Sequence, residues 1–250
     1  MEHIQLMNIF IHNVSMDEAI NEIDKVINTN KKIYVVTPNT DHIVKLECDK
    51  KFKKAYTEAG LVVVDGTPLM WISKWYKNPL KEKITGPRLT EKIIEMSAEK
   101  KYTVFFLGGA ESVALQASQL MEKKYIGLKT VGFYSPKFGF EKDNGEIEKI
   151  ISLVNEVKPD ILIAGMGSPK TEIFLNENIS RMDTHIALSV GAAIDFMAGK
   201  VKRCPAWVNK IGFEWLYRFV KEPKRMFKRY FIDDIKIIKI AFKYKNKHKG

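Results

Sequence analysis

The nine residues Ile161–Pro169 read ILIAGMGSP, an apolar run that ends in a glycine-rich turn. Leu61–Gly66 (LVVVDG) and Thr103–Gly109 (TVFFLGG) repeat this arrangement. Short β-branched and aromatic runs predict strands, and nearly continuous apolar strands are typical of a parallel sheet that is covered on both faces. Six such strands are expected, at residues 33–37, 61–64, 103–107, 130–133, 161–164 and 186–190.

Longer stretches with helical spacing separate these strands. Alternating strands and helices predict βαβ units. We therefore expect an α/β fold, with a Rossmann-like, mostly parallel sheet and helices on both of its faces. The composition agrees, since 45% hydrophobic and 28% charged residues are typical of a folded protein. The expected helices cover residues 16–29, 41–58, 87–100, 112–124, 145–157 and 169–178.

The 250-residue chain carries a formal charge of +11 that is unevenly distributed. Residues 200–250 hold 16 basic and 4 acidic residues, so the rest of the chain is nearly neutral. This step predicts an α/β catalytic domain over 1–199 and a basic helical appendage over 200–250. Two cysteines, Cys48 and Cys204, exclude a disulfide framework. Without a signal-peptide pattern or a membrane-spanning run, we expect a cytoplasmic location.

The appendage also holds 10 of the 27 aromatic residues. Beyond Pro223, apolar side chains recur at three- and four-residue steps among lysines and arginines, a pattern typical of a helix that lies on an anionic membrane surface. The same stripe is also compatible with a helix packed on the body or on a second copy of the chain. A nucleic-acid partner is not expected, because it would leave the motifs at the strand ends without a role. The stripe consists of Phe227, Phe231, Ile235, Ile238 and Phe242.

Small or polar residues follow five of the predicted strands, and ligands of such sheets bind beyond the carboxyl ends of the strands. A nucleotide or sugar-phosphate site is therefore expected there. The GMGSP turn at Gly165–Pro169 offers backbone amides and a helix N-terminus to a phosphate. Lys170 stands where the GxGxxG fingerprint has its last glycine, and no P-loop occurs, which disfavours nicotinamide oxidoreductases and ATPases.

Asp65 ends the run LVVVD, so its carboxylate is expected to face the cleft. It suits a general base, although an Asp-Gly pair also caps its own turn. Thr37 and Asn39 follow the neighbouring strand and suit hydrogen bonds to a sugar or base, or else a self-satisfied Pro-Asn turn. No Asp-x-Asp pair and no HExxH pattern occurs, so neither a metal nor a cofactor is predicted.

With these motifs in order, the chain resembles the WecG/TagA/CpsF glycosyltransferases (glycosyltransferase family 26), and most closely their TagA-type N-acetylmannosaminyltransferases. The resemblance covers roughly residues 5–230. Its blocks are VVTPNTDHIV (35–44), VVVDGTPLMW (62–71), VFFLGGAE (104–111), GMGSPKTE (165–172), SVGAAIDFMAGKVKRCPAW (189–207) and GFEWLYRFVKEPKRMFKRY (212–230).

The resemblance implies an inverting, metal-independent enzyme that transfers a sugar from a UDP-sugar to a polyprenyl-diphosphate-linked amino sugar. N-acetylmannosamine and undecaprenyl-diphospho-N-acetylglucosamine, in wall teichoic acid synthesis, are the expected pair. UDP-glucose or UDP-N-acetylmannosaminuronic acid, for capsule or common antigen, and a non-catalytic UDP-sugar-binding protein are the alternatives. An enzyme of this kind would sit peripherally on the inner face of the cell membrane, and self-association of the chain is a further expectation.

The resemblance also assigns residues. Asp65 falls on the proposed general base, and Thr37 and Asn39 fall on positions that line the substrate pocket. Lys83 and Thr171 stand where the family often has arginine and glutamine. The diphosphate would be bound from the appendage by Arg218, Arg225 and Lys228. Five further residues of the quoted blocks are expected to bind substrate, namely Gly109, Gly167, Ser168, Gly191 and Asp195.

Overall fold

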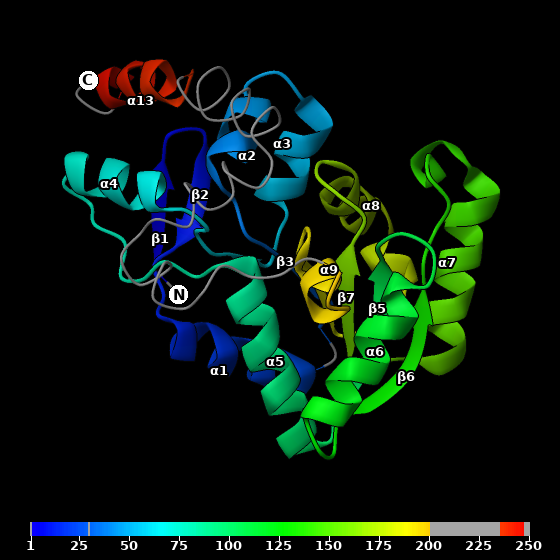
Figure 1. Cartoon of the computed structure of the whole chain (residues 1–250). Helices are drawn as coiled ribbons and strands as arrows, with labels where there is room; N and C mark the ends of the chain where they lie inside the picture. Colours follow the sequence, from blue (N-terminus) through cyan, green and yellow to red (C-terminus); the bar gives the residue numbers. More distant parts are fainter. Residues whose placement is uncertain (1, 30, 201–235, 248–250) are drawn as a thin grey trace.

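A single parallel sheet of six strands forms the centre of the protein (Figure 1). The computed structural model describes residues 2–29, 31–200 and 236–247. All six predicted strands are present, and every neighbouring pair in the sheet is parallel, so the predicted α/β class is confirmed. In spatial order they are β4 (Leu61–Val62), β3 (Ile33–Val36), β8 (Ile186–Ser189), β7 (Ile161–Gly165), β5 (Thr103–Gly108) and β6 (Lys129–Tyr134).

Helices cover both faces of this sheet (Figure 1). Alternate strand residues supply two separate apolar cores, so that in β7 Leu162 packs into one core and Ile163 into the other. The first core lies under α2 (Thr40–Lys45), α3 (Lys50–Thr57), α7 (Asn144–Val157) and α8 (Lys170–Asn178), with the short 3₁₀ turns Phe140–Lys142 and Ile179–Arg181 beside them. The second lies under α1 (Met16–Ile27), α5 (Gly86–Lys100), α6 (Val113–Lys124) and α9 (Ala193–Met197).

Side-chain caps explain where several helices begin. Ser15 and Glu18 form a reciprocal capping box at the start of α1. The single helix predicted over 41–58 is wrong, because the segment forms α2 and α3 instead. The side chain of Asp49 accepts a hydrogen bond from the backbone N–H of Phe52 at 3.0 Å and starts the second helix. Asn39 caps α2 in the same way.

Two strands and two helices were not predicted. The strands β1 (His3–Leu6) and β2 (Ile9–His12) form an antiparallel hairpin, and α4 (Thr67–Trp75) follows β4. The short helix α9 follows β8. The hairpin packs beside the sheet, where His12 Nδ1 accepts a hydrogen bond from the Val62 N–H of β4 at 3.0 Å. The edge of the main sheet next to the predicted site is therefore covered.

The C-terminal helix α13 (Lys236–Lys247) packs against the body, close to α2 and α4 (Figure 1). Ile237, Ile240 and Ala241 are buried and belong to the first apolar core. The predicted appendage thus includes a helix, while the domain boundary at residues 199 and 200 stays a prediction. Among the described residues, no helix has the length and apolar character needed to cross a bilayer.

Candidate active site

Asp65 lies at the rim of the sheet, where β4 ends. Its backbone N–H donates to the carbonyl of Pro38 at 2.8 Å, which ties the end of β4 to the end of β3. Its Oδ2 accepts a hydrogen bond from the backbone N–H of Gly86, the first residue of α5, at 3.1 Å. The carboxyl group is half-buried. It does not cap α4, whose N-cap residue is Gly66 without a side-chain cap, so this carboxyl group instead contacts the positive end of the α5 dipole.

The ends of three strands meet at Gly86. A methyl group on this residue would lie 3.3 Å from Thr37 Oγ1, 3.6 Å from the Val190 carbonyl oxygen and 3.9 Å from Asp65 Oδ2. These three groups come from the carboxyl ends of β3, β8 and β4. The structure therefore brings the predicted base and Thr37 together around Gly86, which was not among the predicted site residues.

Asn39 and Lys83 lie beside this cluster. The side-chain Oδ1 of Asn39 accepts a hydrogen bond from the His42 N–H at 3.2 Å, so the self-capping alternative is correct for this oxygen, and the cap does not use the side-chain Nδ2. Lys83 Nζ lies 3.4 Å from the hydroxyl of Thr67, which begins α4 two residues after Asp65. A cation thus stands on the same rim as the carboxylate.

Glycine-rich turns continue the same edge across β8, β7 and β5. Gly109 donates its N–H to the Gly165 carbonyl at 3.1 Å, and Gly167 and Gly191 have φ angles of 89° and 52°. Both of these glycines have open space where a side chain would point. Four strand spacings of about 4.8 Å separate β4 from β5, so Gly109 lies roughly 19 Å from the Asp65 end of the edge.

The neighbours β7 and β5 form a topological switch point. The chain leaves β7 through α8 toward β8, and it leaves β5 through α6 toward β6, on the opposite side. Ligands of open α/β sheets bind in the crevice at such a point. The glycines that the sequence indicated for phosphate binding therefore occupy the position in the sheet that favours a nucleotide.

Thr171 and Asp195 differ in their surroundings. Thr171 is buried, and its hydroxyl accepts from the Met166 N–H at 2.9 Å and donates to the Gly167 carbonyl at 3.2 Å. These two hydrogen bonds tie the Thr171 side chain to the backbone of the GMGSP turn. Asp195 lies in the first turn of α9, and burial raises the pKa of its carboxyl group. Ser168 lies within the same GMGSP turn.

A buried polar layer lies under the edge, and sequence reasoning missed it. The carboxyl of Glu172 is buried and accepts from the Ser189 hydroxyl at 3.0 Å, and burial raises its pKa to about 7. The Tyr56 hydroxyl lies 2.7 Å from His42 Nδ1. Burial, together with the charges of Glu172, Asp65 and Asp41, raises the pKa of Tyr56. Glu172, His42 and Ser189 fall within the quoted blocks, but none was predicted as a site residue.

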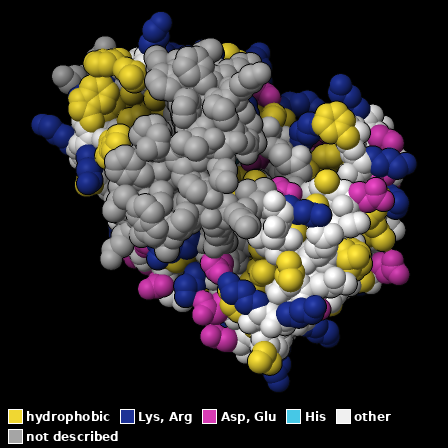
Figure 2. Space-filling view, viewed as in Figure 1, with side chains coloured by type: hydrophobic (Ala, Val, Ile, Leu, Met, Phe, Trp, Pro, Cys, Tyr) yellow, Lys and Arg dark blue, Asp and Glu magenta, His cyan; other side chains and the backbone are white. Residues whose placement is uncertain are grey.

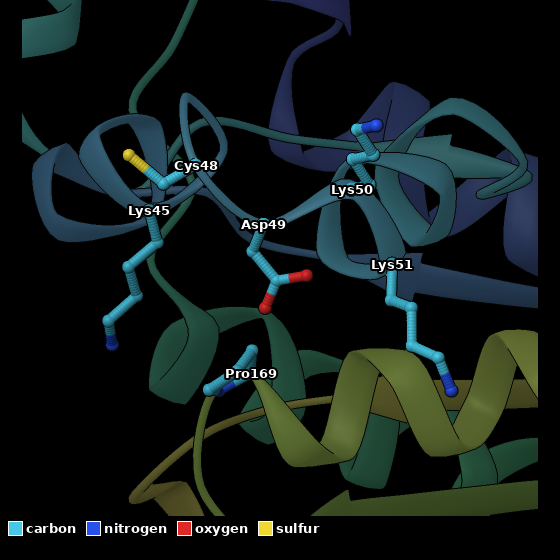
Figure 3. A pocket seen from close by; sticks show the side chains of 6 residues that line it. All are labelled: Lys45, Cys48, Asp49, Lys50, Lys51 and Pro169. Carbon is cyan, nitrogen blue, oxygen red and sulfur yellow. The ribbon is translucent and has the colours of Figure 1, made fainter.

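A shallow pocket of about 530 Å³ lies between the α2–α3 connection and the start of α8 (Figure 3). Asp49 and Pro169 face one another across it, with Lys45 and Lys51 on either side. Those two lysines form ion pairs with Asp41 and Glu177, at 2.7 and 3.0 Å. This basin adjoins the GMGSP turn but does not include Asp65.

The predicted diphosphate-binding residues belong to the appendage, in the part of the chain that the structure does not describe. Arg218, Arg225 and Lys228 lie outside the described residues, and so do Cys204 and the stripe residues Phe227, Phe231 and Ile235. Within the described ranges, no group of three or more His, Cys, Asp or Glu side chains is arranged to hold a metal ion.

The comparison with known families decides the class of this site. A model of the "Glycosyl transferase WecG/TagA/CpsF family" matches residues 4–250. The chain belongs to this family. The resemblance read from the sequence motifs is confirmed, and this WecG/TagA/CpsF protein is a glycosyltransferase.

Two relatives of this glycosyltransferase share the name N-acetylglucosaminyldiphosphoundecaprenol N-acetyl-beta-D-mannosaminyltransferase. The protein of Bacillus spizizenii strain W23 is 25% identical over 199 residues, which cover 80% of this chain and 75% of the relative. That of Staphylococcus aureus strain MW2 is 25% identical over 229 residues, which cover 89% and 86%. The similarity thus extends over most of both relatives.

Proposed function

We propose that this glycosyltransferase moves N-acetylmannosamine from a UDP-sugar to undecaprenyl-diphospho-N-acetylglucosamine. The observation that carries the proposal is the position of Asp65, a carboxylate held at the carboxyl edge of the sheet beside Thr37, Gly86 and Val190. The names of the two relatives support both the acceptor and the transferred sugar. The product would be a lipid-linked disaccharide for wall teichoic acid or a related surface polymer.

The proposed reaction is a single displacement. Asp65 takes the proton of the acceptor hydroxyl while that oxygen forms a bond to the donor's anomeric carbon. The bond from this carbon to the diphosphate oxygen breaks, and UDP leaves with the electron pair. Attack from the face opposite UDP inverts the anomeric centre, whereas retention would need a second nucleophile and a covalent intermediate.

Protein groups would offset the charge of the departing diphosphate. The turn at Gly167–Ser168 and the N-terminal dipole of α8 favour an anion on this side of the site. Lys83 on the rim and, we propose, Arg218, Arg225 and Lys228 of the appendage supply full charges. With these cations we expect no metal requirement, so a chelator would leave the rate unchanged.

The mass of the product reveals which sugar the donor supplies. Incubation with a panel of UDP-sugars and a short-chain lipid-diphospho-N-acetylglucosamine, followed by mass measurement of the product, identifies it. We expect a mass increase of one N-acetylhexosamine from UDP-N-acetylmannosamine. A hexose or N-acetylhexosaminuronic-acid product would move the protein to the capsule or common-antigen branch of the family. UDP binding without any product would instead indicate a UDP-sugar-binding protein.

An acceptor with a polyprenyl chain resides in a membrane. We therefore propose that the protein works at the cytoplasmic face of the cell membrane and reaches its acceptor with help from the appendage. Activity measured with and without anionic vesicles, at equal acceptor availability, tests this. Stimulation by the vesicles supports the proposed location, and its absence counts against it.

A further inference from the structure

Four large apolar side chains are exposed together on α4 and α13. Trp71 and Trp75 of α4 are 64% and 39% exposed, and Ile238 and Phe242 of α13 are each 55% exposed. Figure 2 shows hydrophobic side chains gathered where these two helices lie, with lysines at the rim. We call these four residues the α4–α13 face. A cluster of this kind on a protein surface is typical of an interaction site.

The face is held in place by contacts between the two helices. The rings of Trp75 and Phe242 meet edge to face, with centroids 4.9 Å apart, and the Lys245 ammonium lies 3.7 Å from the Trp75 ring centroid. The Tyr76 hydroxyl donates to the Ala241 carbonyl. Because α13 buries Ile237, Ile240 and Ala241 against the body, Ile238 and Phe242 are left pointing outward. Both helices therefore contribute to one surface.

The charge around this face is mostly positive. No acidic residue occurs from Thr67 to Lys81 or within α13. The first segment contributes Lys74 and Lys77, and α13 contributes Lys236, Lys239, Lys243 and Lys245. One acid, Glu47, contacts α13, where it pairs with Lys243 and accepts a hydrogen bond from the Tyr244 hydroxyl. A ring of lysines around exposed tryptophans matches an anionic lipid surface, because tryptophan favours the bilayer interface and each lysine adds about 1 kcal/mol there.

We propose that the α4–α13 face rests on an anionic bilayer, so that the catalytic body itself, and not only the C-terminal appendage, contacts the membrane. A second copy of the chain fits this face less well, because pairing two copies would bring two sets of lysines together. The consequence for catalysis rests on the proposed function. Since α4 begins two residues after Asp65 and rises only about 6 Å from Thr67 to Trp71, the face would keep the catalytic rim close to the lipid headgroups.

Vesicle flotation of the full chain tests the proposal. The probes are phosphatidylcholine vesicles with and without phosphatidylglycerol, and the variant is Trp71→Ser with Ile238→Ser. The matched control is Ile126→Ser with Phe138→Ser, because these side chains are 95% and 100% exposed outside the α4–α13 face. We expect the wild type and the control to bind anionic vesicles alike, and the variant to bind at least about tenfold more weakly, with binding falling as salt increases.

Two further measurements separate the outcomes. Size-exclusion chromatography of the same proteins reports self-association, and activity is measured on a short, water-soluble acceptor and on a long-chain acceptor in vesicles. We expect the variant to keep its activity on the short acceptor and to lose it on the long one. Unchanged vesicle binding by the variant overturns the proposal, and so does a wild type that does not bind. A variant that loses only dimers assigns the face to a second copy. If the wild type transfers no sugar to either acceptor, the proposed function fails, while the vesicle result still decides the docking surface.

Discussion

The Oδ2 of Asp65 accepts a hydrogen bond from the backbone N–H of Gly86 at 3.1 Å. This bond joins the end of β4 to the first residue of α5 across 21 positions of the sequence. It orients the carboxyl group from one side and keeps it at the N-terminus of a 15-residue helix. The backbone of α5 is thus one of the groups that position the proposed base.

Gly86→Ala tests how closely the reacting groups are packed. Its methyl group would lie 3.3 Å from Thr37 Oγ1, so the hydroxyl or the start of α5 must shift. We expect kcat/KM to fall at least about tenfold, since small misplacements at a reacting centre are costly. The free energy of unfolding should stay within about 1 kcal/mol, because alanine suits a helix better than glycine. Steady-state kinetics and urea unfolding are measured for the wild type and the variant. Wild-type kinetics in the variant would show that the packing of Gly86 against Thr37 does not affect the reaction.

The hydrogen bond between His12 of the hairpin and Val62 of β4 is expected to be sensitive to acid. Burial, followed by the charge of His3, lowers the pKa of His12 to about 4, from 6.5, and His12 Nδ1 accepts the Val62 N–H. Between these values the unfolded chain binds a proton that the folded chain does not, so stability falls as the pH drops from about 6.5 to 4. We expect the wild type to lose roughly 1–2 kcal/mol between pH 7 and pH 5, and His12→Gln to lose less. Parallel losses in urea unfolding would rule this contribution out.

Glu172 predicts the opposite dependence on pH. Its pKa is raised from 4.5 to about 7 by burial, so the folded chain keeps a proton that the unfolded chain releases between these values. The contribution of this group to stability is therefore present below about pH 4.5 and is lost as the pH rises through 7. Glu172→Gln should gain stability relative to the wild type across that window, on the order of 2 kcal/mol. A difference that does not change between pH 5 and pH 8 would mean that Glu172 does not titrate there.

Much of the fold was predictable because a buried parallel sheet leaves a strong sequence signal. Runs such as ILIA and LVVV are short, rich in β-branched residues and followed by glycines, which favours strands over buried helix segments. The break between α2 and α3 was missed because the apolar spacing continues through it, and only the local cap at Asp49 reveals it. The hairpin was missed because its turn, Met7-Asn8, contains no glycine, although Met7 adopts a positive φ of 55°.

The candidate site also contains residues that the sequence predicted and residues that it did not. Asp65, Thr37 and the glycine turns follow predicted strands, so the rule for parallel sheets placed them on one edge. Gly86 and the His42–Tyr56 pair reach this edge from helices, through contacts that no spacing rule predicts. Thr171 was predicted to bind substrate, whereas its hydroxyl is engaged within the GMGSP turn. Whether Thr171 also contacts substrate stays a prediction.

The central claim is that Asp65 removes the proton of the acceptor hydroxyl. The most direct measurement is the turnover of Asp65→Asn with UDP-N-acetylmannosamine and a short-chain acceptor, alongside UDP binding measured by calorimetry. Asparagine keeps the size of the side chain and an oxygen that can accept from Gly86 N–H, but it cannot serve as the base. We predict a fall in kcat of about 10²–10⁴-fold with UDP affinity changed by less than about threefold. Turnover near the wild-type rate would contradict the account.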